Sequence, residues 1–243
     1  IIKSGVPVVC GVRRGVALRE IRRIARERGA PLIEVFGPGR TLEARYARGG
    51  YRFLYAGERG PYAFSLALAG RHQGQNAAVA IATAEVLSRM WKPLDKAKIV
   101  KAVRETRWEG RLETVCRRPL VLLDGAHNAE GAASLAAHVR EAVGRPVVLV
   151  FAAMQDKDVR SMTRLLFPLC STVILTRVPY ERSATPEELA AAAPPFEGRV
   201  LLEPDARKAV HLALAESRGR TPVVIAGSLF LIGEVKRLRI FRD

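Results

Sequence analysis

Residues 120–128 constrain the fold of this chain more than any other segment. Leu-Val-Leu-Leu at residues 120–123 is followed by Asp124 and Gly125, and then by Ala126-His127-Asn128 at the start of a stretch with helical composition. This order predicts a buried strand, a tight turn and a helix. Ligands bind where such strand ends and helix starts meet at the edge of a parallel sheet, and Asp124, His127 and Asn128 would project there. The turn and capping chemistry of Asp and Asn in a plain strand-to-helix turn explains the pattern equally well.

The second half of the chain repeats this alternation of apolar and helical segments. The apolar segments are almost free of polar residues, as in a sheet covered on both faces; they are residues 120–123, 147–151, 173–176, 200–202 and 223–226. Thr185-Pro186-Glu187-Glu188 has the residue types of a helix start. We therefore predict an α/β fold with a doubly wound sheet.

The first half is less regular. A strand at residues 6–10, a helix at 17–28 and a strand at 32–36 form a βαβ pattern. Aromatic residues then alternate on both sides of a turn at residues 57–60, which predicts a hairpin whose rings pack on its sheet rather than stack on bases. Helices are expected at residues 75–90 and 95–105. We place the domain boundary at residue 110, between domains 1–110 and 111–243.

Composition narrows the class of protein. With 243 residues, 49% of them hydrophobic, the chain can form one large or two modest domains. It has no apolar run long enough to span a membrane and no secretory signal, so a cytoplasmic location is expected. Its three cysteines, Cys10, Cys116 and Cys170, are far apart in the sequence and do not have the spacing of a disulfide framework or a zinc site.

The chain is strongly basic. Its net charge is +16, and 32 of its 40 basic residues are Arg. These are scattered along the sequence without a basic block or an aromatic-interleaved stripe, so nucleic-acid binding is not expected. A positive field of this kind favours small anionic ligands.

Four further blocks accompany Asp124-Gly125-Ala126-His127-Asn128 in a fixed order: residues 70–78, 108–113, 154–158 and 226–233. Together they resemble the bifunctional dihydrofolate synthase/folylpolyglutamate synthase family, a branch of the Mur ligase superfamily, over the whole chain. The resemblance implies the remnant of a P-loop-type central ATPase domain, followed by a Rossmann-like, doubly wound C-terminal Mur ligase domain.

The resemblance also implies a nucleotide site. Asp124 would accept hydrogen bonds from the ribose hydroxyls, with His127 and Asn128 facing the ribose or the phosphates. Asn76 would read the adenine edge, and Arg111 would reach the ATP phosphates. The family has a proline after the Asn, and Ala129 stands there in this chain, a change that should cost local rigidity more than chemistry.

Two residues are candidates for substrate binding. Lys157, in Asp156-Lys157-Asp158, could hold a carboxylate or a phosphate, although a salt-bridged turn explains it equally well. Ser228 matches a block that helps bind the incoming glutamate in some family members. Phe230 replaces a tyrosine of that block, so no side-chain hydrogen bond is available from that position.

The implied activity is ATP-dependent addition of L-glutamate to dihydropteroate or folate through an acyl phosphate, with Mg²⁺. No Gly-Lys pair of a P-loop occurs in the sequence, and the chain begins at Ile1 without an initiator Met. We expect a piece of a longer enzyme that is inactive without its amino-terminal half. By the same resemblance the magnesium ligands lie upstream, and no metal-binding residue is expected here.

Two other functions remain open. A cell-wall Mur ligase shares the mechanism and adds an amino acid to a nucleotide-linked sugar, although the residues at 154–158 and 227–229 favour the folate branch. A non-catalytic, basic nucleotide-binding module is the alternative from another class. A parent of roughly 400 residues or more would indicate the full ligase.

Overall fold

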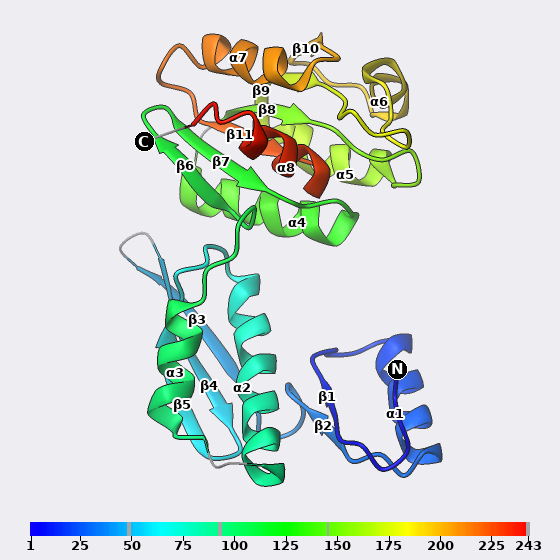
Figure 1. The fold of residues 1–243 in the computed structure, drawn as a ribbon, viewed down its shortest axis with the longest axis vertical. Helices are drawn as coiled ribbons and strands as arrows, with labels where there is room; N and C mark the ends of the chain where they lie inside the picture. Colours follow the sequence, from blue (N-terminus) through cyan, green and yellow to red (C-terminus); the bar gives the residue numbers. More distant parts are fainter. Residues whose placement is uncertain (48–49, 92–93, 145, 242–243) are drawn as a thin grey trace. The chain divides into compact units, whose positions relative to one another are not determined.

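A computed structural model describes residues 1–47, 50–91, 94–144 and 146–241 (Figure 1). The chain divides into two compact units, Ile1–Arg107 and Trp108–Asp243. The division falls three residues before the boundary that we placed at residue 110.

The first unit begins with the βαβ pattern expected from the sequence. Strand β1 (Val8–Cys10) and strand β2 (Leu32–Glu34) pair in parallel, and helix α1 (Val16–Glu27) connects them. The strands are shorter than predicted. Val6 lies before β1 and is exposed.

An antiparallel sheet follows, in the order β3-β4-β5. Its strands are β3 (Leu42–Ala47), β4 (Gly50–Gly57) and β5 (Gly60–Ser65), and β4 and β5 form the predicted hairpin. The hairpin aromatics are buried in the core of this unit, which confirms that they pack on the sheet: Tyr51, Phe53, Tyr55, Tyr62 and Phe64. Strand β3 was not predicted. It is an edge strand with half-exposed and exposed residues, so its sequence lacks a clear apolar alternation.

Helix α2 (His72–Met90) and helix α3 (Lys96–Glu105) complete the unit. Helix α2 begins three residues before the predicted start. Gly74 lies in its first turn, where a Cβ atom would stand 2.1 Å from the ring of Phe53. A glycine at this position therefore lets the helix approach the sheet closely, which the sequence pattern did not reveal.

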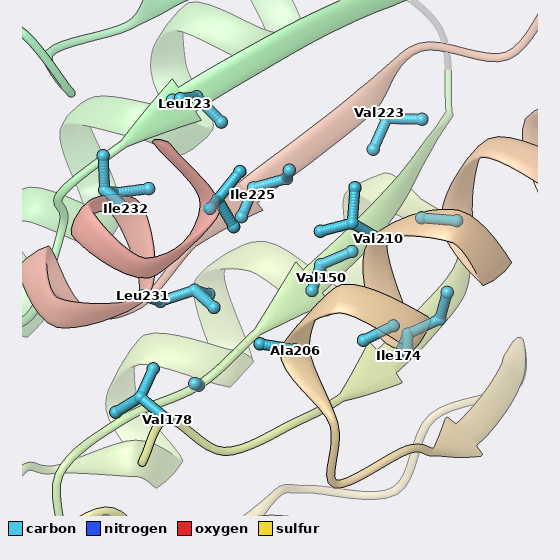
Figure 2. Packing of buried hydrophobic residues seen from close by; sticks show 14 of the residues in the cluster. Leu123, Val150, Ile174, Val178, Ala206, Val210, Val223, Ile225, Leu231 and Ile232 are labelled. Atoms are coloured by element: carbon cyan, nitrogen blue, oxygen red, sulfur yellow. The ribbon is translucent and has the colours of Figure 1, made fainter. Parts of the chain in front are cut away.

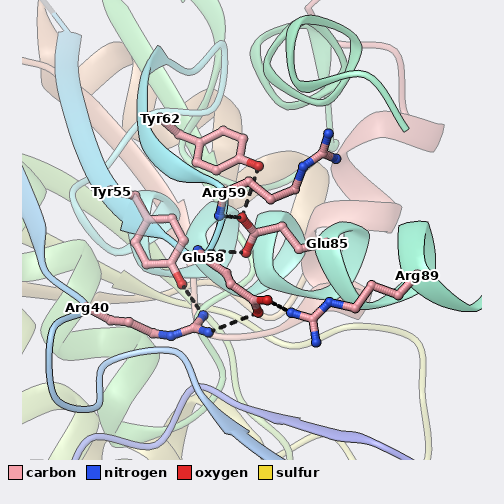
Figure 3. A network of polar contacts seen from close by, with 7 residues as sticks. All are labelled: Arg40, Tyr55, Glu58, Arg59, Tyr62, Glu85 and Arg89. Atoms are coloured by element: carbon pink, nitrogen blue, oxygen red, sulfur yellow. Dashed lines mark hydrogen bonds and ion pairs between the residues drawn. The ribbon is translucent and has the colours of Figure 1, made fainter. Parts of the chain in front are cut away.

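A buried carboxylate connects the β4–β5 turn to α2 (Figure 3). Glu85 on α2 is 2% exposed, and its Oε1 accepts hydrogen bonds from the backbone N–H of Arg59 at 2.8 Å and from the Tyr62 hydroxyl at 3.0 Å. Its Oε2 accepts one from the backbone N–H of Glu58 at 3.2 Å. The carboxylate thus satisfies two backbone donors of a tight turn and the hydroxyl of Tyr62 in β5, and we expect it to be structural.

The second unit contains a six-stranded sheet in the order β10-β9-β8-β11-β7-β6. All five predicted strands are present and parallel: β7 (Leu120–Asp124), β8 (Val147–Phe151), β9 (Cys170–Leu175), β10 (Arg199–Leu202) and β11 (Val223–Ala226). The sixth strand, β6 (Glu113–Arg117), is not among the predicted ones. It pairs antiparallel with β7 through a short turn and is only partly buried, so it has no continuous apolar run.

Helices cover both faces of this sheet, which confirms the doubly wound α/β fold (Figure 1). They are α4 (Ala129–His138), α5 (Val159–Leu166), α6 (Pro186–Ala192), α7 (Ala206–Ser217) and α8 (Leu229–Arg237). A π-helical turn, Val139–Val143, extends α4, and a short 3-10 turn, Phe167–Leu169, follows α5. The predicted start of α6 is confirmed, because Thr185 and Glu188 form a capping box.

The core between the sheet and helices α7 and α8 is a single cluster of apolar side chains (Figure 2). Alternate strand residues such as Leu123, Val150 and Ile225 contribute to it, together with Val210 of α7 and Leu231 of α8. Burial of this kind contributes about 25 cal/mol for each Å² of apolar surface removed from water. It holds the carboxyl ends of the central strands in a fixed arrangement.

Candidate functional site

The turn after β7 is organised around the carboxylate of Asp124. This residue is 5% exposed; its Oδ1 accepts a hydrogen bond from the backbone N–H of Ala126 and its Oδ2 one from that of Leu112, both at 2.9 Å. Burial raises the pKa of Asp124, and these two hydrogen bonds oppose the rise. Each carboxylate oxygen keeps a second lone pair, so the group can still accept a ligand hydroxyl.

Arg111 lies in the segment that Asp124 holds. The backbone N–H of Gly125 donates to the carbonyl oxygen of Gly110 at 2.7 Å, which ties the other side of the same segment to the turn. Gly110 and Leu112, on either side of Arg111, both have positive φ angles, 65° and 49°. The half-buried Arg111 side chain therefore starts from a backbone that the β7–α4 turn constrains from both sides.

The same segment is tied to α8. Glu113 accepts a hydrogen bond from the backbone N–H of Gly110 at 2.7 Å and pairs with Lys236 of α8 at 2.8 Å. Lys236 also pairs with Glu109 at 3.1 Å. Residues 109–113 are thus held to the second unit by hydrogen bonds and ion pairs, and the position of Arg111 relative to the edge of the sheet is fixed.

Asn128 caps helix α4. Its Oδ1 accepts a hydrogen bond from the backbone N–H of Gly131 at 2.7 Å, and its backbone is extended. This is the capping role that the plain-turn interpretation predicts for Asn128. A side-chain amide that caps with its oxygen still has two N–H donors for a ligand.

His127 is half-buried, and its Nδ1 lies 2.8 Å from the carbonyl oxygen of Gly125. A carbonyl oxygen can only accept, so Nδ1 carries the proton in this contact. In the neutral ring the lone pair is then on Nε2. The turn therefore sets the tautomer of a histidine at the edge of the sheet.

A cavity of about 190 Å³ lies at this edge. Three predicted site residues line it: His127 after β7, Lys157 after β8 and Ser228 after β11. These strands are adjacent in the sheet, with β11 between the other two, and the chain reverses its direction of winding there. This is the position at which doubly wound folds bind ligands. Its other lining residues are Met154, Asp156, Arg182, Gly227, Leu229 and Phe230.

Both interpretations of the Asp156-Lys157-Asp158 block have a counterpart in the structure. The ammonium of Lys157 pairs with Asp156 at 2.9 Å, and Asp158 caps α5 through the backbone N–H of Ser161 at 3.0 Å. The ion pair with Lys157 lowers the pKa of Asp156. Hydrogen bonds between Asp158 and Ser161 lower the pKa of Asp158. Lys157 nevertheless lines the cavity, so it is both part of a salt-bridged turn and available to a ligand.

Ser228 is buried and caps α8, because its Oγ accepts a hydrogen bond from the backbone N–H of Phe230 at 3.1 Å. Gly227 before it has a φ of 107°, and a Cβ atom there would meet the carbonyl oxygen of Ala152 at 2.2 Å. Only glycine fits this close approach of two strand ends. Gly227 therefore positions the serine hydroxyl at the wall of the cavity.

Sequence reasoning missed Arg182, which reaches the cavity from the loop after β9. The signal available was weak. Arg182 follows the end of a predicted parallel strand, but it is one of 32 arginines and lies seven residues beyond Leu175. Only the path of the loop brings it to the cavity.

Asn76 belongs to the first unit, where it is exposed on α2. Its Nδ2 donates a hydrogen bond to Oε1 of the buried Gln73 at 3.0 Å. The structure therefore places Asn76 on a regular helix with part of its amide still open to a ligand. Arg71 is at the N-cap position of that helix, and its side chain forms no capping hydrogen bond.

The described residues do not fit a metal ion. Within the ranges that the structure covers, no group of three or more His, Cys, Asp or Glu side chains could hold one. None of the helices in these ranges has the length and apolar character that a membrane span needs.

Comparison with known proteins agrees with this geometry. Residues 110–229 match the family model of the Mur ligase glutamate ligase domain. The chain is 30% identical over 239 residues to the folylpolyglutamate synthase of Lacticaseibacillus casei, and 28% identical over 244 residues to the dihydrofolate synthase/folylpolyglutamate synthase of Bacillus subtilis. Each alignment covers 98% of this chain and 55% of the relative, so the chain spans about half the length of these relatives.

Solved structures agree as well. A folylpolyglutamate synthase of Mycobacterium tuberculosis complexed with ADP superimposes with a TM-score of 0.85 at 28% identity, over 95% of this chain and 54% of that one. The second unit is therefore a Mur ligase glutamate ligase domain. The chain as a whole belongs to the folylpolyglutamate synthase/dihydrofolate synthase family.

Proposed function

We propose that this chain is the carboxyl-terminal part of an ATP-dependent ligase that adds L-glutamate to dihydropteroate, folate or both. The observation that carries the proposal is the cavity at the reversal point of the sheet, where His127, Lys157 and Ser228 meet. The family relationship supports the same activity, and the ADP complex of the Mycobacterium tuberculosis relative supports a nucleotide as cosubstrate.

The reaction has two steps. A carboxylate oxygen of the folate substrate attacks the γ-phosphorus of ATP, and the bond to ADP breaks, which leaves an acyl phosphate. The amino nitrogen of glutamate then attacks the acyl carbon, phosphate leaves with its electron pair, and the nitrogen loses a proton. Such chemistry depends mainly on positioning and on charge stabilisation.

Residues near the β7–α4 turn would hold the nucleotide. Asp124 accepts hydrogen bonds from ribose hydroxyls through its remaining lone pairs, and the amide of Asn128 donates to the ribose or the phosphates. Arg111 places its planar guanidinium on phosphate oxygens, where it offsets negative charge. That the amide of Asn76, in the first unit, reads an adenine edge stays a prediction from the family resemblance. Asp124 also keeps Arg111 in place through its hydrogen bond from Leu112.

Residues around the cavity would hold the glutamate. Lys157 and the hydroxyl of Ser228 bind its carboxylates, and Nε2 of His127 can take the proton that the amine loses, because Nδ1 is committed to the carbonyl of Gly125. We expect Mg²⁺ only in the whole enzyme, because the described residues form no group of side chains that could hold a metal ion.

The test is release of ADP that depends on both glutamate and dihydropteroate. We expect no turnover from this chain alone and turnover when the amino-terminal half is supplied, since no P-loop occurs among these residues. Arg111→Gln should lower kcat of the complete enzyme about 100-fold or more, as removal of a transition-state donor does. Arg117→Gln, on the exposed edge strand, is the matched control. Turnover by the chain alone would show that it is not an inactive fragment.

A substrate panel separates this proposal from a cell-wall ligase, because both share the glutamate ligase domain. Dihydropteroate and reduced folates should support turnover, and nucleotide-linked sugars should not. A complete protein that binds nucleotide but turns over neither class would instead be the non-catalytic module. We also propose that the enzyme works in the cytoplasm, where ATP is available, and that its required partner is its own amino-terminal half.

A further inference from the structure

The cavity contains two cationic side chains that differ in their existing partners. Lys157 pairs with Asp156 at 2.9 Å, so its charge is already compensated. For Arg182, no described carboxylate lies within the 4.0 Å of an ion pair. Arg182 acts on Asp156 through its charge, without an ion pair. No carboxylate of the described residues therefore occupies its N–H donors, and an anion that enters the cavity can form charge-assisted hydrogen bonds with them.

The loop that carries Arg182 is tied to the loop after β8. The carbonyl oxygen of Arg182 accepts a hydrogen bond from the backbone N–H of Gln155 at 2.9 Å, and Ser183 forms an antiparallel bridge with Met154. The N–H of Ala184 donates to the carbonyl of Ala153 at 3.0 Å. These contacts fix the backbone of Arg182 beside Lys157 and leave its side chain to the cavity.

The guanidinium has an aromatic support. Its Cζ lies 5.7 Å from the centroid of the Tyr180 ring, and Tyr180 stacks on Phe230 with centroids 4.6 Å apart and an interplanar angle of 20°. Phe230 follows the capping Ser228 at the start of α8. Contact with an aromatic face restrains an arginine without consuming its N–H donors. The support thus lowers the entropy that the side chain would lose when it binds an anion.

The size of the cavity indicates the kind of anion. Sites for drug-sized ligands enclose about 300–1,000 Å³, and this cavity encloses about 190 Å³. A nucleotide is too large to be contained in it, whereas an amino acid fits. The apolar wall of Met154, Leu229 and Phe230 suits the methylene groups of a side chain.

We propose that Arg182 is the residue that recognises a carboxylate of the incoming amino acid and makes the cavity selective for a dicarboxylic one. This inference rests on the proposed function, because the ligase must take glutamate somewhere. It assigns that specificity to the loop after β9, with Tyr180 and Phe230 as its support.

The test is calorimetric titration of L-glutamate into the 243-residue chain and its variants. Arg182→Gln should weaken binding about 10- to 100-fold, the usual cost of losing a charge-assisted hydrogen bond. Arg182→Lys should recover part of this loss, because it keeps the charge without the planar fork. Arg220→Gln is the matched control, since Arg220 is exposed before the start of β11, away from the carboxyl ends of the strands. L-glutamine should bind more weakly than L-glutamate to the unsubstituted 243-residue chain, and the affinities for the two amino acids should become equal in Arg182→Gln.

Four outcomes would overturn the inference. Equal affinity of Arg182→Gln and the parent chain for L-glutamate would remove Arg182 from the site and leave the proposed ligase intact. Equal losses of affinity for L-glutamate in Arg182→Gln and Arg220→Gln would show that the effect comes from net charge alone. Binding of inorganic phosphate instead of glutamate, with the same dependence on Arg182, would assign the residue to the nucleotide. Absence of glutamate binding by the unsubstituted 243-residue chain would refute the cavity as the amino-acid site. The ADP-release assay tests the proposed ligase activity separately.

Discussion

The carboxylate of Asp124 and the backbone N–H of Leu112, twelve residues apart in the chain, form a hydrogen bond of 2.9 Å. Leu112 has a φ of 49°, a conformation that costs a non-glycine residue about 1–3 kcal/mol unless its surroundings hold it. Asp124 supplies part of that support. One buried carboxylate thereby connects the end of a central strand to the segment that carries Arg111.

We expect Asp124→Asn to lower the free energy of unfolding by about 1–3 kcal/mol, because the amide N–H₂ would face a backbone N–H and leave it unsatisfied. Urea unfolding of this chain measures the change. Asp158→Asn is the control: it replaces one good helix cap by another at an exposed position and should change stability by no more than about 0.5 kcal/mol. Equal effects of the two substitutions would contradict the role of Asp124.

The pH dependence of Asp124 should be opposite to that of the paired surface carboxylates. Burial raises its pKa above the ordinary value of 3.8, so the folded chain holds this proton more tightly than the unfolded chain does. The contribution of Asp124 to stability is therefore greatest at acid pH and declines as the pH rises from 3.8 through the raised pKa. Carbon-13 NMR of the carboxyl group measures that pKa directly. A midpoint below 3.8 would show that the two hydrogen bonds outweigh burial.

The buried pair of Glu85 and Tyr62 predicts that the stability of the first unit is sensitive to alkali. Burial, and then the charge of Glu85, raises the pKa of Tyr62 to about 12 from an ordinary value of 10.0. The folded state thus retains the proton longer than the unfolded state, and stability is lost as the pH rises from 10.0 towards 12. Tyr62→Phe should lose less stability over that range, measured by urea unfolding at each pH. Tyr46→Phe, at an exposed ring of β3, should follow the parent chain.

Two glycines, one at the cavity and one within α8, should respond differently to alanine. Gly227→Ala adds a Cβ 2.2 Å from the carbonyl oxygen of Ala152 at a φ of 107°, and should destabilise the chain by about 1–3 kcal/mol or more. Gly233→Ala, in α8 with no atom within 4 Å of the added Cβ, should stabilise it by about 0.5–1 kcal/mol. Thermal unfolding of the two variants, side by side, makes the comparison. Equal shifts would mean that the approach of β11 to β8 is not tight.

Much of the second unit could be predicted from local sequence. Each of its five parallel strands contains a run of apolar residues, and Thr185 with Glu188 forms the capping box that their spacing indicates. Capping by Asn128 is likewise local, because the acceptor and the donor are three residues apart. Elements of this kind can be predicted from the sequence because a strand or a helix start depends mainly on its own residues and their immediate neighbours.

Edge elements were harder to predict. Strands β3 and β6 have mixed, half-exposed residues, so burial left no clear period in their sequences. The start of α2 was placed too late, because Gly74 is favourable there only through its contact with Phe53 on another element.

The sequence by itself determined the doubly wound α/β fold and the presence of Asp124, His127 and Ser228 at strand ends. Tertiary structure alone decided that Asp124 supports the segment around Arg111, that Lys157 is already paired, and that Arg182 reaches the cavity. The physical reason is that local conformation follows from the pattern of neighbouring residues. The partners of a charge depend instead on how distant segments pack, and one arginine among 32 is singled out only by that packing.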